Sequence, residues 1–234
     1  MNTDKHISSQ FDSELTSIST RVLELGGLVE AQIAAAITSL VQLDRSIADR
    51  VSEVEQTVNQ MELDIDRDLS KMIVRRQPAA SDLRFLIGVS KTTANLERAG
   101  DEAEKIARMA KSIIQSGSGR RMPVAELKLA ADLASDILRR ALDALARLDA
   151  AEAVQIIRED DKIDVEFNGF LRKLVTFMME DPRTISASLD LVFVAKALER
   201  IGDHAKNIAE MIIYIVKGAD VRHTPTEKME SVIG

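Results

Sequence analysis

Two pairs of acidic residues recur at the same spacing in this sequence and could bind a cation. Glu97 and Asp101 lie four residues apart, and Glu199 and Asp203 repeat the pattern 102 residues later. Residues four apart share one face of a helix, where two carboxylates repel each other by roughly 0.2–0.5 kcal/mol. A glycine precedes the second acid of each pair, and a mid-helix glycine costs about 1 kcal/mol relative to alanine. The repetition of these unfavourable choices indicates a compensating role.

Further carboxylate and amide side chains precede each pair by one helix. Glu55, Asn59 and Glu62 follow a single helical stripe in the first half of the chain. In the second half, Asp160 and Asp164 stand 105 residues after Glu55 and Asn59. If consecutive helices are antiparallel neighbours, each half brings several of these oxygens together. Such oxygens form a site for a hard cation such as Mg²⁺, Mn²⁺, Ca²⁺ or iron.

The predicted metal ligands therefore come from both halves of the chain: Glu55, Asn59, Glu62, Glu97, Asp101, Asp160, Asp164, Glu199 and Asp203. Mg, Mn or iron is favoured over Zn, because the chain has no cysteine and only three histidines. The alternative is that the acids form solvated faces, paired with nearby basic residues such as Arg98 and Arg200. For His204, beside the second pair, an ordinary hydrogen bond is a better expectation than metal binding.

The elements that must position these residues all follow a helical period. From residue 51 to 72, apolar residues recur every three or four positions, which is typical of long helices packed side by side. Gly100 and Gly202 lie on such apolar stripes, where they would let a neighbouring helix approach closely. The breaks in the pattern predict an all-α fold of six helices at about 7–43, 46–76, 82–115, 123–148, 150–180 and 185–217.

The two halves of the chain repeat each other. LDRSIADRV begins at residue 43 and LDAAEAVQI at 148, while LERAGDEAEKIA begins at 96 and LERIGDHAKNIA at 198. SGSG at 116–119 begins the one flexible interior linker. The sequence thus predicts two tandem, similar three-helix bundles, at 7–116 and 123–217, followed by a flexible tail at 218–234.

Composition narrows the classes of function. The net charge of −7 argues against a nucleic-acid-binding protein. The N-terminus lacks an apolar signal core, and no apolar run approaches the length of a membrane span, so we expect a soluble cytoplasmic protein. No nucleophile–base pair and no Glu-x-x-His pair occur, so we expect no enzymatic activity.

The motifs RRQPAASDLR (75–84), LERAGDEAEKIA (96–107) and LVFVAKALERIGDHAKNIAEMIIYIVKG (191–218) resemble those of the PhoU family. The resemblance spans about residues 7–218. It implies two three-helix bundles and a cytoplasmic, non-enzymatic regulator that reaches the membrane only through its partners. Such a regulator dampens the phosphate-starvation response by linking the ATPase of a phosphate ABC transporter to a sensor histidine kinase.

The resemblance also implies metal clusters bound through paired E/D-x-x-x-D motifs, which the acid pairs match. Asn59 replaces a carboxylate by an amide, so the first site has one negative charge fewer, with Glu62 near enough to compensate. Two other interpretations stay open: a helical scaffold that binds metal without a role in phosphate signalling, and a carboxylate-bundle metalloprotein. The sequence leaves open whether the chain forms a homodimer, and which face meets the partners.

Overall fold

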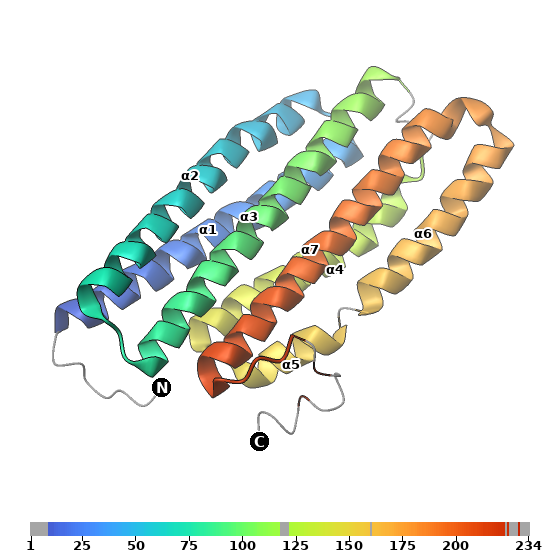
Figure 1. Cartoon of the computed structure of the whole chain (residues 1–234). Helices are drawn as coiled ribbons and strands as arrows, with labels where there is room; N and C mark the ends of the chain where they lie inside the picture. Colours follow the sequence, from blue (N-terminus) through green and yellow to red (C-terminus); the bar gives the residue numbers. More distant parts are fainter. Residues whose placement is uncertain (1–8, 118–121, 160, 223, 225–228, 230–234) are drawn as a thin grey trace.

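The computed structural model describes residues 9–117, 122–159, 161–222, 224 and 229, with the side chains of all but 9, 125, 126 and 161–164 (Figure 1). The described residues form helices joined by short turns, which confirms the all-α prediction. The elements are α1 Ser9–Gln42, α2 Arg45–Arg76, α3 Ala80–Gln115, α4 Val124–Arg147, α5 Ala150–Glu159, α6 Asp161–Glu180, the 3₁₀ turn η2 Pro182–Thr184, and α7 Ile185–Lys217.

The helices make two bundles that lie side by side. α1, α2 and α3 form one, and α4 to α7 form the other, with α3 against α7 and α1 against α4 (Figure 1). α3 and α7 run antiparallel, so that Gly88 near the start of α3 meets Ile215 near the end of α7. A Cβ atom on Gly88 would lie 2.5 Å from Ile215 Cγ1, so only glycine allows this close contact.

Corresponding turns repeat the same chemistry in both halves. Leu43 and Leu148, 105 residues apart, each adopt a left-handed conformation with φ of 54° and 52°. The next residue is an aspartate in both cases. Asp44 Oδ1 accepts hydrogen bonds from the backbone N–H groups of Ser46 and Ile47, and Asp149 Oδ1 accepts one from Glu152. The prediction that Asp44 or Ser46 caps the second helix is confirmed for Asp44.

The helix expected at 150–180 is described in two parts, α5 up to Glu159 and α6 from Asp161, and the residue between them lies outside the described residues. One predicted boundary is wrong. The helix expected from residue 82 begins at Ala80 without a side-chain cap, because the extended backbone of Ala79 directly after Pro78 already starts the turn.

α1 provides the centre of the first core. Val22, Leu25, Val29 and Ile33 are at most 1% exposed. By length and composition alone, Gln10–Gln42 could cross a membrane, which departs from the expectation that no segment is apolar enough. A core helix passes the same test because its apolar residues face its neighbours, as those of α1 do.

The chain leaves α7 at Gly218, whose positive φ of 73° ends the helix. Two side chains beyond this point, Val221 and Met229, are 1% and 3% exposed and belong to the core. Nothing in the sequence pattern predicted the burial of these two side chains, because isolated apolar residues outside a helical stripe carry no periodic signal.

Candidate functional site

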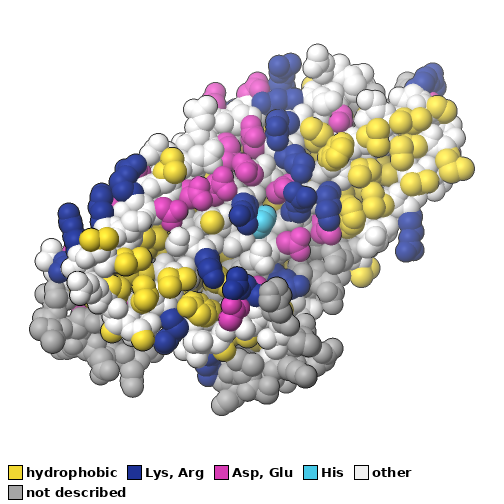
Figure 2. Space-filling model, viewed as in Figure 1, with side chains coloured by type: hydrophobic (Ala, Val, Ile, Leu, Met, Phe, Trp, Pro, Cys, Tyr) yellow, Lys and Arg dark blue, Asp and Glu magenta, His cyan; other side chains and the backbone are white. Residues whose placement is uncertain are grey.

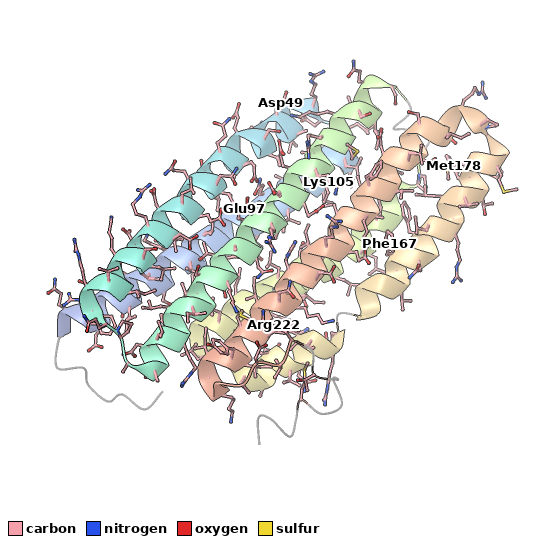
Figure 3. The ribbon with its side chains drawn as sticks, in the orientation of Figure 1. Asp49, Glu97, Lys105, Phe167, Met178 and Arg222 are labelled. Carbon is pink, nitrogen blue, oxygen red and sulfur yellow. The ribbon has the colours of Figure 1, made fainter. Side chains whose placement is uncertain are left out.

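The predicted ligands of the first half meet in the groove between α2 and α3, which we call the acidic groove. Glu55 and Glu62 come from α2, and Glu97 and Asp101 from the facing side of α3. Acidic side chains gather over these two helices in Figure 2, and Figure 3 labels Glu97 among them. The antiparallel arrangement of α2 and α3 thus brings the acids together as the spacing predicted, while Asn59 is exposed on α2.

Glu55 forms the floor of the acidic groove. Its side chain is 6% exposed, and its Oε2 accepts a hydrogen bond of 2.6 Å from Nε2 of Gln32, a residue of α1 that is 2% exposed. Glu55 Oε1 and Gln32 Oε1 are both buried without a hydrogen-bond partner. Buried acceptors without a donor are costly, so this position favours a bound cation or a proton.

Three glutamates of the acidic groove have raised pKa values. Burial first, and then the repulsion of neighbouring carboxylates, raises the pKa of Glu97 to about 7. Burial also raises the pKa of Glu55 and of Glu62, and Asp101 on the facing helix raises that of Glu55 further. Near neutral pH the groove therefore carries a repulsion that a cation would relieve.

Gly100 allows the acidic groove to form. A Cβ atom there would lie 3.1 Å from Gln32 Oε1, 3.2 Å from Glu55 Oε2 and 3.2 Å from Val58 Cγ1. The prediction that this glycine lets neighbouring helices approach closely is confirmed. The cost of a mid-helix glycine is offset by the contact of three helices at this point.

No three of the described His, Asp and Glu side chains form a group that could hold a metal ion as they stand. The acidic groove nevertheless fits a hard cation in charge, in donor type and in the orphaned oxygen of Glu55. Glu62, Glu97 and Asp101 would hold it together with Glu55. Whether the nine predicted ligands bind a metal stays a prediction.

The second groove, between α6 and α7, has a different chemistry. Glu199 is half-buried and forms an ion pair with Lys196 on its own helix. The Lys196 ammonium lies 5.4 Å from the centre of the Phe167 ring on α6, and Phe167 stands where the first half has Glu62. A lysine and an aromatic ring thus occupy space that is acidic in the first half.

The remaining predicted ligands of the second half are only partly placed. Asp203 is exposed and lines a hollow of about 510 Å³ with other charged and polar residues of α7 and with Arg222 beyond the helix. Asp160 lies outside the described residues, and Asp164 belongs to α6 but its side chain also lies outside them. The second metal site therefore stays a prediction from the sequence.

His204 belongs to the contact between the two bundles. Its Nδ1 lies 3.1 Å from Oδ1 of Asn95 on α3, and Asn207 Nδ2 donates to the same oxygen at 3.1 Å. Burial, followed by the positive charge of Arg98, lowers the pKa of His204 to about 4, so the ring is neutral at neutral pH and donates through Nδ1. The expectation of an ordinary hydrogen bond is confirmed.

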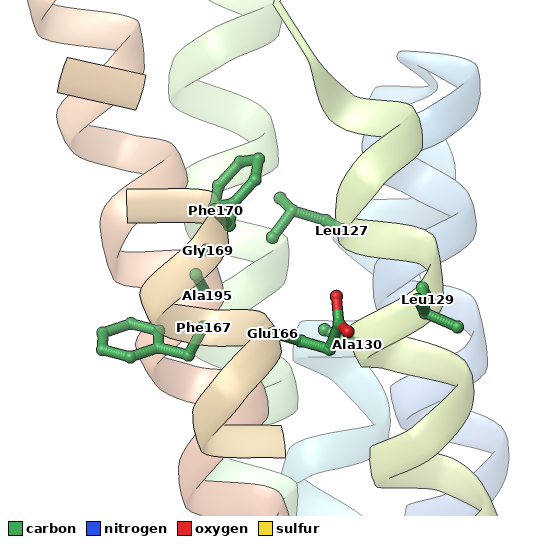
Figure 4. Close-up of a pocket in the computed structure, with 8 residues that line it drawn as sticks. All are labelled: Leu127, Leu129, Ala130, Glu166, Phe167, Gly169, Phe170 and Ala195. Carbon is green, nitrogen blue, oxygen red and sulfur yellow. The ribbon is translucent and has the colours of Figure 1, made fainter. Parts of the chain in front are cut away.

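A cavity of about 240 Å³ lies between α4, α6 and α7 (Figure 4). Apart from Glu166, its lining is apolar or glycine, including Leu127, Phe167 and Phe170. The lining offers no pair of groups for catalysis. Gly169 borders this cavity and is itself exposed, and a Cβ atom there would meet nothing within 4 Å.

Comparison with known proteins decides the family. The model of the PhoU domain matches residues 22–110 and 127–212, which together cover most of both bundles. The chain belongs to the PhoU family. The Escherichia coli phosphate-specific transport system accessory protein PhoU is 45% identical over 234 residues, which cover 100% of this chain and 96% of that protein. A homologue from Pseudomonas putida is 46% identical over 228 residues, covering 97% of this chain and 89% of that protein.

Solved PhoU structures share the fold. The crystal structure of PhoU from Pseudomonas aeruginosa matches with a TM-score of 0.86 and 43% identity, covering 89% of this chain and all of that one. The phosphate transport system regulatory protein PhoU from Streptococcus pneumoniae matches with a TM-score of 0.83 and 26% identity, covering 90% and 99%. The resemblance inferred from the sequence motifs is thus confirmed.

One residue of the acidic groove escaped the sequence analysis of this PhoU-family chain. Gln32 lies on α1, outside the helices that carry the predicted ligands. The signal for it was a polar residue set among Val29, Ile33 and Ala36 on the apolar stripe of its helix. A polar residue at a core position indicates a buried partner, although the sequence cannot name that partner.

Proposed function

We propose that this chain is the accessory protein of a phosphate-specific transport system and a negative regulator of the phosphate-starvation response. In this role it links the ATPase of the phosphate ABC transporter to a sensor histidine kinase when phosphate is plentiful. The observation that carries the proposal is the match to accessory proteins of this system along both bundles. The protein acts in the cytoplasm, binds rather than catalyses, and reaches the membrane through its partners.

The experiment is a phosphate-starvation reporter in cells that lack this chain and grow with ample phosphate. We expect the reporter to switch on in the deletion strain and to fall silent when the chain is restored from a plasmid. A reporter that stays silent in a strain from which every related gene has been removed would contradict the regulatory role. Phosphate uptake, measured in the same strains, separates a role in transport from one in transcription.

We further propose that the acidic groove binds a divalent or trivalent cation, with Mg, Mn or iron preferred over Zn. Glu55, Glu62, Glu97 and Asp101 would hold it, because they supply hard oxygen donors around a buried acceptor that lacks a partner. When bound, the cation would neutralise the repulsion between α2 and α3 and change the charge of this face. Metal content of the purified protein, with and without chelation, tests this proposal.

The second candidate is a metal-binding helical scaffold or metalloprotein without a signalling role, and it is favoured by the raised pKa of Glu97 near a buried carboxylate. It predicts metal retention with a normal reporter response in the deletion strain. The regulatory role predicts instead that the reporter switches on when the chain is deleted. It predicts this whether or not the acidic groove binds metal. The two measurements together distinguish the candidates.

A further inference from the structure

The groove between α6 and α7 leaves large apolar side chains uncovered toward the side opposite the core. On α6, Val175 is 51% and Met179 is 79% exposed; on α7, Ile185, Leu189 and Phe193 are 43%, 49% and 51% exposed. Hydrophobic side chains gather over these two helices in Figure 2. We call these five residues the apolar groove. Contiguous exposed apolar surface of this kind marks interaction sites.

The first bundle provides an internal comparison for the apolar groove. The tips of both hairpins are apolar, since Val74 and Leu83 stand where the second half has Met179 and Ile185. Away from the tip the halves differ. Ser70 and Lys91 occupy the positions equivalent to Val175 and Phe193.

The same difference continues on α6, where Phe167 and Leu171 replace Glu62 and Asp66 of α2. Among the five residues of the apolar groove, three have apolar counterparts in the first half, since Val74, Leu83 and Ile87 stand at the positions of Met179, Ile185 and Leu189. The first half builds the same bundle without apolar residues at the positions of Val175 and Phe193, so these two exposed side chains are not needed for the bundle itself. Their exposure indicates that something outside the described fold covers them.

Basic residues border the apolar groove on the side of the first bundle. A row of Lys and Arg side chains separates the hydrophobic area from the acidic side chains in Figure 2. Lys105 and Arg200 share a single carboxylate, that of the buried Glu102. The side chain of Arg108 is 58% exposed, and its Nε lies 3.7 Å from Oε2 of Glu104 on the same helix. The border thus carries more positive than negative charge and would complement acidic side chains.

We propose that the apolar groove binds an amphipathic helix of a partner protein, one whose acidic edge lies along the row that contains Lys105, Arg108 and Arg200. A groove between two antiparallel helices accepts a further helix, because that helix completes a four-helix arrangement. This inference rests on the proposed function, which supplies the partners: the transporter ATPase and the sensor kinase. It assigns to them the face of the molecule that they contact.

The test transfers the first half's own residues into the second. The variant V175S/F193K carries Ser and Lys, which the fold already tolerates at the equivalent positions 70 and 91. A matched control, L63N/V216K, also replaces two exposed apolar side chains, one of them by lysine, but at Leu63 and Val216, which are 58% and 39% exposed outside the apolar groove. Thermal unfolding of both variants establishes that each is folded before binding is measured.

Binding of the full chain to the purified transporter ATPase, and separately to the cytoplasmic part of the kinase, is measured by titration calorimetry. We expect V175S/F193K to weaken binding to at least one of them by about tenfold or more, while L63N/V216K stays within about twofold of wild type. If wild type binds neither protein, the proposed link itself fails, and the inference with it. If wild type binds and V175S/F193K binds equally well, the link stands and this inference is overturned.

The acidic edge has a test of its own. Arg108→Glu should slow association several-fold at low salt, and the difference from wild type should shrink as salt is added. Protection of an acidic helical segment of the partner in hydrogen exchange would support the proposed occupant. An equal association rate for Arg108→Glu and wild type would overturn the charge complementarity.

Two other occupants would overturn the proposal. A wild-type dimer that V175S/F193K converts to monomer in analytical ultracentrifugation would assign the apolar groove to a second copy of the chain. Binding to vesicles of phosphatidylglycerol and phosphatidylethanolamine that V175S/F193K abolishes, with protein binding unchanged, would assign it to lipid. The expected results are an unchanged oligomeric state and no vesicle binding that depends on this groove.

Discussion

The two halves of this PhoU-family chain share a fold and differ in the groove that each presents. In the first half, α2 and α3 face each other with carboxylates around the buried Glu55. In the second, α6 and α7 carry a lysine paired with Glu199, the Phe167 ring beside it, and exposed aliphatic residues toward the hairpin tip. A repeated bundle fixes where a groove lies, whereas the residues that line it are free to diverge. The comparison suggests a division of labour, with ions in one groove and a partner helix at the other.

Metal binding gives the largest expected difference between the grooves. The double variant E97Q/D101N should lower metal affinity by at least about 100-fold, because it removes two of the four carboxylates around the acidic groove. E199Q/D203N should lower it less, since Lys196 already neutralises Glu199. Metal content after dialysis against a defined free Mn²⁺ concentration measures both.

Retention of metal by E97Q/D101N together with loss in E199Q/D203N would reverse the comparison and place the stronger site in the second half. Equal metal content in wild type and both variants would show that neither groove is the site. Circular dichroism of each variant serves as the control for folding.

Packing under the acidic groove gives the next effect. Gly100→Val should lower the free energy of unfolding by about 2 kcal/mol, because its side chain would overlap Gln32, Glu55 and Val58. Gly169→Ala on α6 should instead raise it by up to about 1 kcal/mol, since a Cβ atom there meets nothing within 4 Å. Urea unfolding measures both, and a stable Gly100→Val variant would show that α1 and α2 can move away from α3.

Charge at the floor of the acidic groove should oppose stability. Glu55→Gln should raise the free energy of unfolding of the metal-free protein by about 1 kcal/mol at pH 8, because an amide there could pair with both polar atoms of Gln32 and would end the repulsion by Asp101. The exposed Glu53→Gln is the matched control and should change it little. A loss of stability in Glu55→Gln would mean that its carboxylate has a favourable partner.

The smallest expected effect concerns how the free energy of unfolding depends on pH. Glu97 and His204 should act in opposite directions, each by about 1 kcal/mol once solvent screening is allowed for. The pKa of Glu97 is raised from 4.5 to about 7, so its contribution to stability is present below pH 4.5 and lost as pH rises through 7. The pKa of His204 is lowered from 6.5 to about 4, so its contribution is present above pH 6.5 and lost as pH falls through 4.

Relative to wild type, Glu97→Gln should therefore gain stability as pH rises from 4.5 to 8. His204→Asn, which keeps a donor for Asn95, should gain relative stability as pH falls from 6.5 to 4. Urea unfolding of the metal-free proteins over this range measures both differences. Parallel curves for wild type and Glu97→Gln would show that Glu97 is not coupled to the acidic groove.

Much of the fold could be read from local patterns. The three-and-four spacing of apolar residues predicted the helices, and Asp44 was correctly placed among the capping residues. The start of α3 at Ala80 escaped prediction because the turn after Pro78 needs no side-chain cap.

The acidic groove, like the fold, could be predicted from the sequence only in part. Glu55, Glu62, Glu97 and Asp101 could be brought together from their spacing and from the antiparallel order of consecutive helices. Gln32 could not, because its partner lies 23 residues away on another helix. The sequence offered basic residues such as Arg98 and Arg200 as partners of the acids, but the structure pairs Glu199 with Lys196, whose ammonium also lies over the Phe167 ring.

The sequence by itself determined the all-α class, the repeated bundle, the positions of the acid pairs and the membership of the PhoU family, because periodicity and motifs are properties of neighbouring residues. Only the tertiary structure decided which acids are buried, why the pKa of Glu97 reaches about 7, and which groove is left apolar and exposed. Burial and electrostatic repulsion depend on distances between helices that are remote in the chain, and those distances exist only once the bundles have packed.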